Sequence, residues 1–211
     1  MANRKLLIAL AAISAWGLSM PTFGYFETFK RYTYYGPYSG AYLGGQFGYA
    51  NTQYDSSLYN QLEIRHDGIA GRVYLGSQFN PYFGAEFGVA LFSNSEIGNN
   101  YGHIKTGEID VLLRAGIPLY CSKFRFDLKG GVVSGMSIYH PTPEAISAGY
   151  VKNSNTYIKP AAGASISYYV TQNIALDLSY QHVFGSPNNK GETAPTIDFA
   201  SFGVSYLFIT V

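Results

Sequence analysis

Four histidines are the side chains best suited to metal or acid chemistry in this sequence. His66, His103, His140 and His182 each lie in or beside one of four long polar segments. A ring of imidazoles at such positions could bind a metal ion or respond to low pH. No two of them have the local spacing of a zinc site, so we expect solvated histidines and no metal.

Charged side chains form the other candidate set, since ten of them fall on one parity of alternating segments. Five are basic and five acidic, so ion pairing is the expected chemistry. Such a set could gate ions or fill a narrow interior, and the sequence favours a structural network. The ten residues are Arg72, Glu86, Glu108, Asp110, Arg114, Arg125, Asp127, Lys129, Lys159 and Asp177.

The composition excludes an ordinary solvated surface. Charged residues make up 13% of the 211-residue chain, about half of the quarter usual for soluble globular proteins. The 24 glycines, 20 tyrosines and 14 phenylalanines suit strands with lipid outside and a narrow interior. A net charge of +1 gives no electrostatic case for nucleic-acid binding.

Alternating apolar residues predict eight strands long enough to cross a bilayer. In the clearest one, 82–92, Phe83, Phe87 and Leu91 share one face, and Glu86 lies between two glycines on the other. No apolar face carries a charge in its middle. A soluble lipocalin-like barrel would need charges outside, and these are too few. The eight segments are 39–50, 68–79, 82–92, 105–117, 124–138, 156–170, 174–184 and 197–209.

The connections alternate between short turns and long polar loops. This asymmetry is typical of an antiparallel up-and-down barrel in the bacterial outer membrane, with long loops extracellular and both termini periplasmic. Closure leaves no unpaired strand edge in the hydrocarbon. An eight-stranded barrel is filled by its own side chains, so we expect a plugged lumen and not a diffusion porin. The long loops are 51–67, 93–104, 139–155 and 185–196.

Several motifs resemble the OmpA-type eight-stranded outer-membrane barrel family, which includes opacity-like porins. They are Gly76-Ser-Gln-Phe-Asn-Pro-Tyr-Phe-Gly-Ala-Glu-Phe-Gly, Arg114-Ala-Gly-Ile-Pro, Gly130-Gly-Val and Phe202-Gly-Val-Ser-Tyr-Leu-Phe. The resemblance covers about 38–208. It implies a C-terminal signal read by the barrel-assembly machinery, with periplasmic chaperones as further partners. We assign that signal to Tyr206 with Phe208 or Val211, because three residues follow Phe208.

The resemblance also suggests roles for the interior charges. Glu86 and Arg114 match the family's lumen carboxylate and one of its basic partners, whereas Asp177 stands where the best-known member has an arginine. We therefore expect Glu86 to pair with Arg114 or Arg72. Asp177 is expected to pair with Lys129, Arg125 or Lys159.

The N-terminal segment reads as a secretory signal peptide. Arg4 and Lys5 precede an apolar run of about 15 residues, which is shorter than a membrane-spanning helix. We place cleavage after Gly24, which makes 1–24 the signal peptide, 25–38 a periplasmic lead-in and 39–211 the barrel. Cys121, the only cysteine, cannot form an internal disulfide.

Two functions remain open for such a barrel. The first is a structural, envelope-stabilising role as a monomer in lipid and lipopolysaccharide. The second is surface adhesion or host-factor binding through loops 51–67 and 139–155. Catalysis is not expected, because the His-x-Ser pattern of lipid A deacylase barrels is missing: Phe184 stands two residues after His182. No cofactor is expected.

Overall fold

The computed structural model describes residues 39–54, 67–97, 101–119, 123–185 and 194–209. The expected signal peptide and lead-in lie outside these residues. Among the described residues no helix is long and apolar enough to cross a membrane. The elements are β1 (Gly40–Gln53), β2 (Asp67–Gln78), β3 (Phe83–Phe92), β4 (Ser95–Ile97), β5 (Gly102–Pro118), β6 (Phe124–Pro141), α2 (Pro143–Ser147), β7 (Asn153–Tyr169), β8 (Ile174–Val183) and β9 (Thr196–Ile209).

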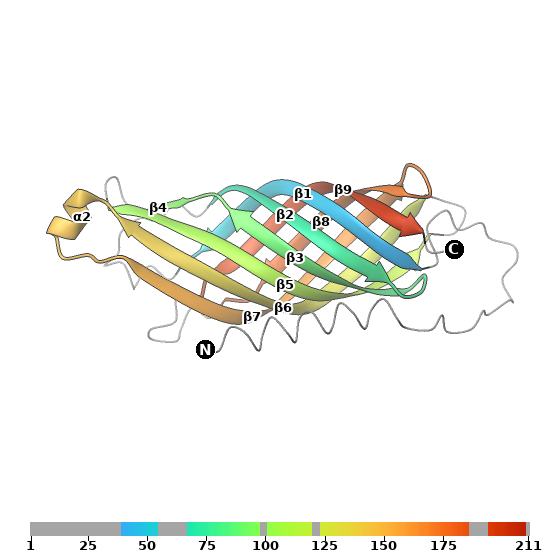
Figure 1. Ribbon diagram of the computed structural model, residues 1–211, viewed down its shortest axis with the longest axis horizontal. Helices are drawn as coiled ribbons and strands as arrows, with labels where there is room; N and C mark the ends of the chain where they lie inside the picture. Colours follow the sequence, from blue (N-terminus) through green and yellow to red (C-terminus); the bar gives the residue numbers. More distant parts are fainter. Residues whose placement is uncertain (1–38, 55–66, 98–100, 120–122, 186–193, 210–211) are drawn as a thin grey trace, which may run out of the picture.

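Eight of the strands close into an antiparallel barrel (Figure 1). Consecutive barrel strands are hydrogen-bonded neighbours, β3 pairs with β5, and β1 pairs with β9 to complete the ring. The short strand β4 pairs with the outer end of β5, beyond the part that β3 covers. The predicted eight-stranded up-and-down barrel is confirmed, with β4 as an addition.

Side-chain parity divides each strand between lipid and lumen. On the outer face of β3, Phe83, Phe87 and Leu91 are 56%, 39% and 67% exposed. Their neighbour Glu86 points inward and is only 2% exposed. Because consecutive side chains alternate sides, an apolar exterior and a polar interior follow from the same residues. The predicted outward sets are all exposed or half-buried.

Short turns close one end of the barrel through local side-chain hydrogen bonds. The Asn80 side-chain oxygen accepts from the backbone N–H groups of Tyr82 and Phe83, at 2.8 and 2.9 Å. The Thr171 hydroxyl similarly accepts from the N–H groups of Asn173 and Ile174. Such residues stabilise tight turns by replacing backbone hydrogen bonds.

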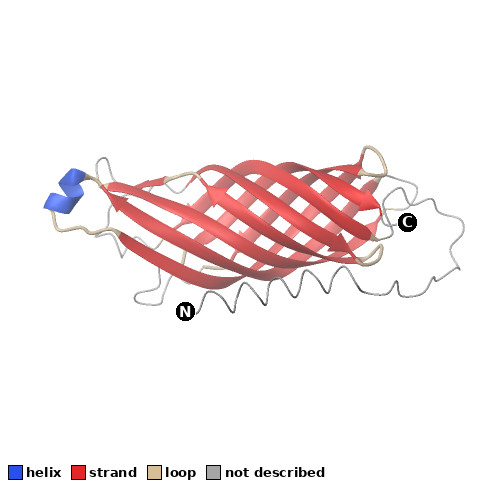
Figure 2. Cartoon of the chain, viewed as in Figure 1, coloured by secondary structure: helices blue, strands red, loops and turns tan. Residues whose placement is uncertain are grey.

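Three strands extend beyond the others at the opposite end (Figure 2). β5, β6 and β7 have 17, 18 and 17 residues, whereas β3 and β8 have 10. The expectation of irregular loops over 93–104 and 139–155 was therefore wrong in part. These segments contain β4, α2 and the outer strand ends, because β5 and β6 stay paired from Gly102 and Pro141 onward. We call this projection of β4–β7 and α2 the outer extension.

Candidate functional site: a charged lumen

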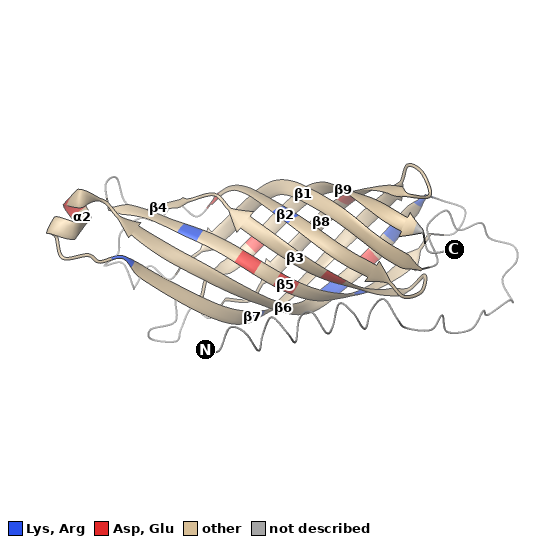
Figure 3. Ribbon diagram, in the orientation of Figure 1, with Lys and Arg blue, Asp and Glu red and all other residues tan. Residues whose placement is uncertain are grey.

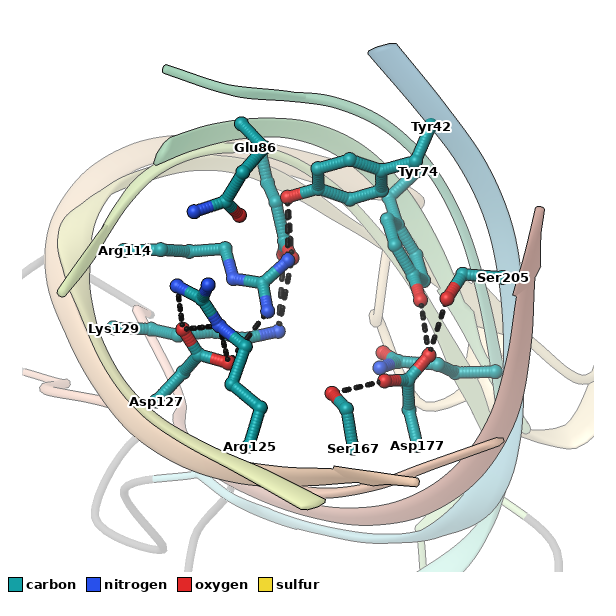
Figure 4. Close-up of polar contacts among 12 residues, drawn as sticks. Tyr42, Tyr74, Glu86, Arg114, Arg125, Asp127, Lys129, Ser167, Asp177 and Ser205 are labelled. Atoms are coloured by element: carbon teal, nitrogen blue, oxygen red, sulfur yellow. Dashed lines mark hydrogen bonds and ion pairs between the residues drawn. The ribbon is translucent and has the colours of Figure 1, made fainter. Parts of the chain in front are cut away.

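Glu86 lies at the centre of a buried ion-pair network inside the barrel (Figure 4). Its carboxylate is 3.2 Å from the Arg72 guanidinium and 3.3 Å from that of Arg114. The Lys129 ammonium lies 3.1 Å from both carboxylate oxygens. One carboxylate thus contacts three cations that come from β2, β5 and β6. The structure places Glu86 against both predicted partners and adds Lys129.

Two further carboxylates balance these cations. Asp110 accepts two hydrogen bonds from Arg72, at 2.6 and 2.8 Å. Asp127 lies 2.6 Å from Arg114 and 2.7 Å from Arg125, and its exposure is zero. Arg125 also donates to the carbonyl of Pro81, which connects the network to the turn between β2 and β3. Buried charges are tolerated when each is paired in this way.

Two inward tyrosines complete the network. The Tyr42 hydroxyl accepts from Arg114 at 2.7 Å and donates to Glu86 at 3.2 Å. Tyr42 lies opposite Gly76 and Tyr74 lies opposite Gly44 in the β1–β2 ladder. A Cβ atom at either glycine would collide with the ring opposite. The glycines therefore make the room in which both rings lie flat across the ladder.

Asp177 corrects one of our expectations. It accepts hydrogen bonds from the hydroxyls of Ser167 at 2.5 Å, Ser205 at 2.9 Å and Tyr74 at 3.0 Å (Figure 4). None of Lys129, Arg125 or Lys159 pairs with it. Lys129 is turned toward Glu86 and Arg125 toward Asp127, so neutral hydroxyls from β2, β7 and β9 solvate this carboxylate instead.

Glu108 stands apart from the main network. It is 3% exposed, and its carboxylate accepts from the Tyr157 hydroxyl at 2.8 Å. Lys159 shares the inward parity of Tyr157 on β7 and is half-buried. All ten predicted charges therefore have inward parity, but the structure does not join them into one balanced set. Figure 3 shows how sparsely charged positions occur along the strands.

Apolar side chains share the lumen with the ion pairs. Phe92 packs against two clusters of buried side chains and lies edge-on to Phe199 at 6.2 Å. Together with Phe92, these clusters contain an inward apolar residue from each of the eight barrel strands. They are Ala50, Ala70, Leu112, Val133, Ala161, Val183, Ile197 and Phe199. We call these residues, with Phe92, the apolar layer.

A third set of contacts lies toward the outer end of the lumen. Tyr54, Ile97, Ile104 and Tyr139 form a buried cluster against which Tyr150 packs. A hydroxyl hydrogen bond of 3.1 Å between Thr52 on β1 and Ser95 on β4 joins two strands that are not neighbours in the sheet. Strand β4 contributes to both sets. This short strand therefore lines the outer end of the lumen as well as extending the barrel wall.

The aromatic residues divide differently from our expectation of two interface girdles. Tyr139 and Tyr157 were expected at the lipid interface, but they are 7% and 6% exposed and face inward. Strand parity already indicated the inward position of Tyr157, because this residue shares a face with Lys159. The same rule would have found Tyr42 and Tyr74, which share faces with Gln46 and Arg72. End-of-strand position alone cannot separate lipid-facing from lumen-facing aromatics.

The histidines do not form a ring. His103 and His140 are directly opposite on β5 and β6, and their rings stack with centroids 5.2 Å apart. His182 lies 2.7 Å from Asp198 on the barrel exterior. His66 lies outside the described residues. Among the residues with described positions, no group of three or more His, Cys, Asp or Glu side chains could hold a metal ion.

The expected assembly signal lies on the last strand. Tyr206 and Phe208 face outward, are 48% and 52% exposed and pack edge to face at 5.1 Å. Val211 lies outside the described residues.

The fold and its lumen agree with comparisons to known proteins. Residues 38–210 match the family model of the OmpA-like transmembrane domain, so the chain belongs to this family. It is a bacterial outer-membrane β-barrel, placed among lipid and lipopolysaccharide.

Named relatives share the barrel at modest sequence identity. An uncharacterized protein of Coxiella burnetii is 26% identical, with 97% of this chain and 99% of the relative covered. Outer membrane protein A of Salmonella typhi is also 26% identical over 79% of this chain, but only 48% of its own length is covered. The chain thus spans about half of that protein. The crystal structure of OprG from Pseudomonas aeruginosa superposes with a TM-score of 0.62 at 13% identity, covering 84% of this chain and all of OprG.

Proposed function

We propose that this protein is a non-conducting barrel that stabilises the outer membrane. The observation that supports the proposal best is the apolar layer to which every barrel strand contributes a residue. Hydrated ions would have to shed water to pass it, in addition to breaking the pairs around Glu86. Apolar side chains and closely paired charges in the same lumen favour a structural role over an ion gate.

The orientation follows from the asymmetry of the two ends. The short turns, the start of β1 and the end of β9 lie at the end of the barrel that faces the periplasm. The outer extension lies at the opposite end and faces the medium. The protein works as a monomer, because the eight-stranded ring leaves no unpaired strand edge in the barrel wall below the outer extension. It inserts through the assembly machinery by means of Tyr206 and Phe208. It has no catalytic role, since the serine hydroxyls that donate to a carboxylate, those of Ser167 and Ser205, are buried in the lumen.

A deletion strain tests the envelope role. Loss of the protein should increase sensitivity to detergent and osmotic shock, and the wild-type gene should restore resistance. A variant with Glu86→Gln and Phe92→Ala, produced at the same level as the wild type, should also restore resistance if the role is purely structural. This comparison requires that the variant folds. Folding is read from the gel mobility of unboiled samples. Unchanged resistance in the deletion strain would contradict the proposal.

One specific surface favours a second function, binding of a protein through the tip of the outer extension. Helix α2 has Thr142 as its N-cap, whose hydroxyl accepts from the Ala145 N–H at 3.3 Å. This ordered tip presents Ile146 and Val151, which are 59% and 74% exposed. Ordered apolar side chains held far from the membrane suit a protein contact.

Replacement of the tip separates the two functions. A variant with Ile146→Ser and Val151→Ser keeps the helix cap and should fold as the wild type does. If the protein is an adhesin, cells carrying this variant lose attachment to host cells while envelope resistance stays normal. Equal attachment would leave the structural role as the only function.

A further inference from the structure

Four nitrogen-bearing side chains converge on the outward face of the outer extension. His103 on β5 lies opposite His140 on β6, and Lys105 lies two residues further along β5 on the same face. Lys152 immediately precedes β7, next to the Tyr139–Asn153 pair, and so lies beside His140. We call these residues the basic face.

Acidic side chains lie near the basic face but do not pair with its lysines. Neither Lys105 nor Lys152 makes an ion pair with any residue that the structure describes. Glu96 lies opposite His103 on β4, and Glu144 lies on α2. Neither acid is among the groups whose charge acts on His140. Lysines that converge without ion-pair partners favour the binding of an anion.

The pKa of His140 depends on the charges of the other three residues of the basic face. The pKa of His140 lies below its ordinary value, because partial desolvation disfavours the imidazolium and Lys152, His103 and Lys105 repel it. An anion on the basic face would offset this repulsion. Binding would therefore be coupled to proton uptake by the stacked pair.

The depth of the basic face in the membrane identifies the anion. On the outer face of β5, Ile109 is the last exposed aliphatic residue before Gly107 and Lys105. On the neighbouring strand β6 the exposed apolar face reaches further, to Met136, which lies opposite Gly107. Two residues of a tilted strand then place Lys105 about 5 Å beyond this apolar boundary along the membrane normal. The polar headgroup layer begins at the hydrocarbon boundary and is roughly 5–8 Å thick on each side of a bilayer. Phosphate groups of the outer leaflet lie at this level.

We propose that the basic face binds a phosphate group of an outer-leaflet glycolipid. Lys105 and Lys152 supply fixed positive charge, and His103 and His140 donate hydrogen bonds once they are protonated. The inference rests on the proposed orientation, which puts this end of the barrel in the lipopolysaccharide leaflet.

Nanodiscs test the ligand directly. The full-length mature chain, labelled with ¹⁵N histidine, is reconstituted in phosphatidylcholine with and without diphosphorylated lipid A, and the pKa of His140 is read by NMR. We expect lipid A to raise this pKa by about one unit. Combined Lys105→Gln and Lys152→Gln should abolish most of that difference. Lys123→Gln is the matched control, because Lys123 lies at the opposite end and contacts the Val170 carbonyl at 3.5 Å.

Three outcomes would overturn the proposal. The pKa could be equal in the two lipids, Lys123→Gln could abolish the difference equally well, or inorganic phosphate in phosphatidylcholine nanodiscs could raise the pKa as strongly as lipid A. Lipid A faces both barrel ends in a nanodisc, so these outcomes do not depend on orientation in the cell. Labelling of Val151→Cys, in a Cys121→Ser background, on intact cells tests that orientation separately.

Discussion

The Glu86 carboxylate lies 3.1 Å from the Lys129 ammonium, although the two residues are 43 positions apart on β3 and β6. Arg72 and Arg114 approach the same carboxylate at 3.2 and 3.3 Å. Removal of this one negative charge would leave four buried cations in the network with two remaining acids, Asp110 and Asp127. The lumen therefore depends on Glu86 more than on any other charge in the network.

Glu86→Gln should lower the free energy of unfolding by about 3–5 kcal/mol, because it leaves buried cations unpaired. Urea titration of the folded protein in lipid vesicles, followed by circular dichroism or gel mobility, measures the loss. Glu96→Gln is the control: this exposed side chain on β4 should change stability by less than about 0.5 kcal/mol. Equal effects of the two substitutions would contradict the network.

Asp177→Asn should cost much less, about 1 kcal/mol, because neutral hydroxyls and not cations surround this carboxylate. An amide can still accept from one hydroxyl and donate to another. The same urea titration compares it with Glu86→Gln. A loss as large as that of Glu86→Gln would mean that a cation pairs with Asp177 after all.

Gly76→Ala should destabilise the barrel by about 1–3 kcal/mol, since the new methyl group would collide with the Tyr42 ring. Displacement of Tyr42 would also break its hydrogen bonds to Arg114 and Glu86. Gly45→Ala is the matched control on the same sheet. Its Cβ would point outward and meet nothing within 4 Å. A tolerated Gly76→Ala would show that the ring can move freely.

Lys152→Gln should raise the pKa of His140 part of the way to its ordinary value, since desolvation, His103 and Lys105 would remain. The direction of this pKa shift also determines how the stability of the fold depends on pH. The unfolded chain binds this proton more tightly than the folded one, so protonation of His140 costs stability as pH falls below about 6.5 and has no effect above it. NMR titration in phosphatidylcholine checks both statements, and an unchanged pKa would contradict the repulsion.

Strand parity predicted the barrel because lipid and a narrow interior impose opposite demands on alternate residues. Phe83 and Glu86 show this on one strand, and the ten charges expected in the interior all share the inward parity of their strands. Parity predicted the structure less well beyond the hydrocarbon, where lipid no longer favours apolar side chains on one face of a strand. The outer ends of β5 and β6, the strand β4 and the helix α2 project beyond the other barrel strands, and alternation in this part of the sequence is weak.

The partners of the interior charges could be predicted only in part. Glu86 was assigned to the right arginines because the family resemblance fixed its place. Asp177 was assigned to a cation because charge balance was assumed to act pair by pair. In the structure the tilt of the strands brings Tyr74, Ser167 and Ser205 to it first, and this three-dimensional offset is not visible in a list of parities.

The stacked histidines show the same limit. His103 and His140 are 37 positions apart and have no local spacing that indicates a site. The β5–β6 register brings them face to face, and Lys152 reaches them from the start of β7. Register is set by the whole ladder, including pairs far from the histidines, so the basic face could not be predicted from its own residues.

Ion conduction tests the central claim, that the lumen is closed, most directly. Purified wild-type protein and the Glu86→Gln variant, both verified as folded by the gel mobility of unboiled samples, are inserted into planar bilayers under an applied voltage. The apolar layer around Phe92 remains in both proteins, so we predict that neither shows current steps. Reproducible single-channel steps in the wild type, or steps that appear on Glu86→Gln alone, would contradict the account.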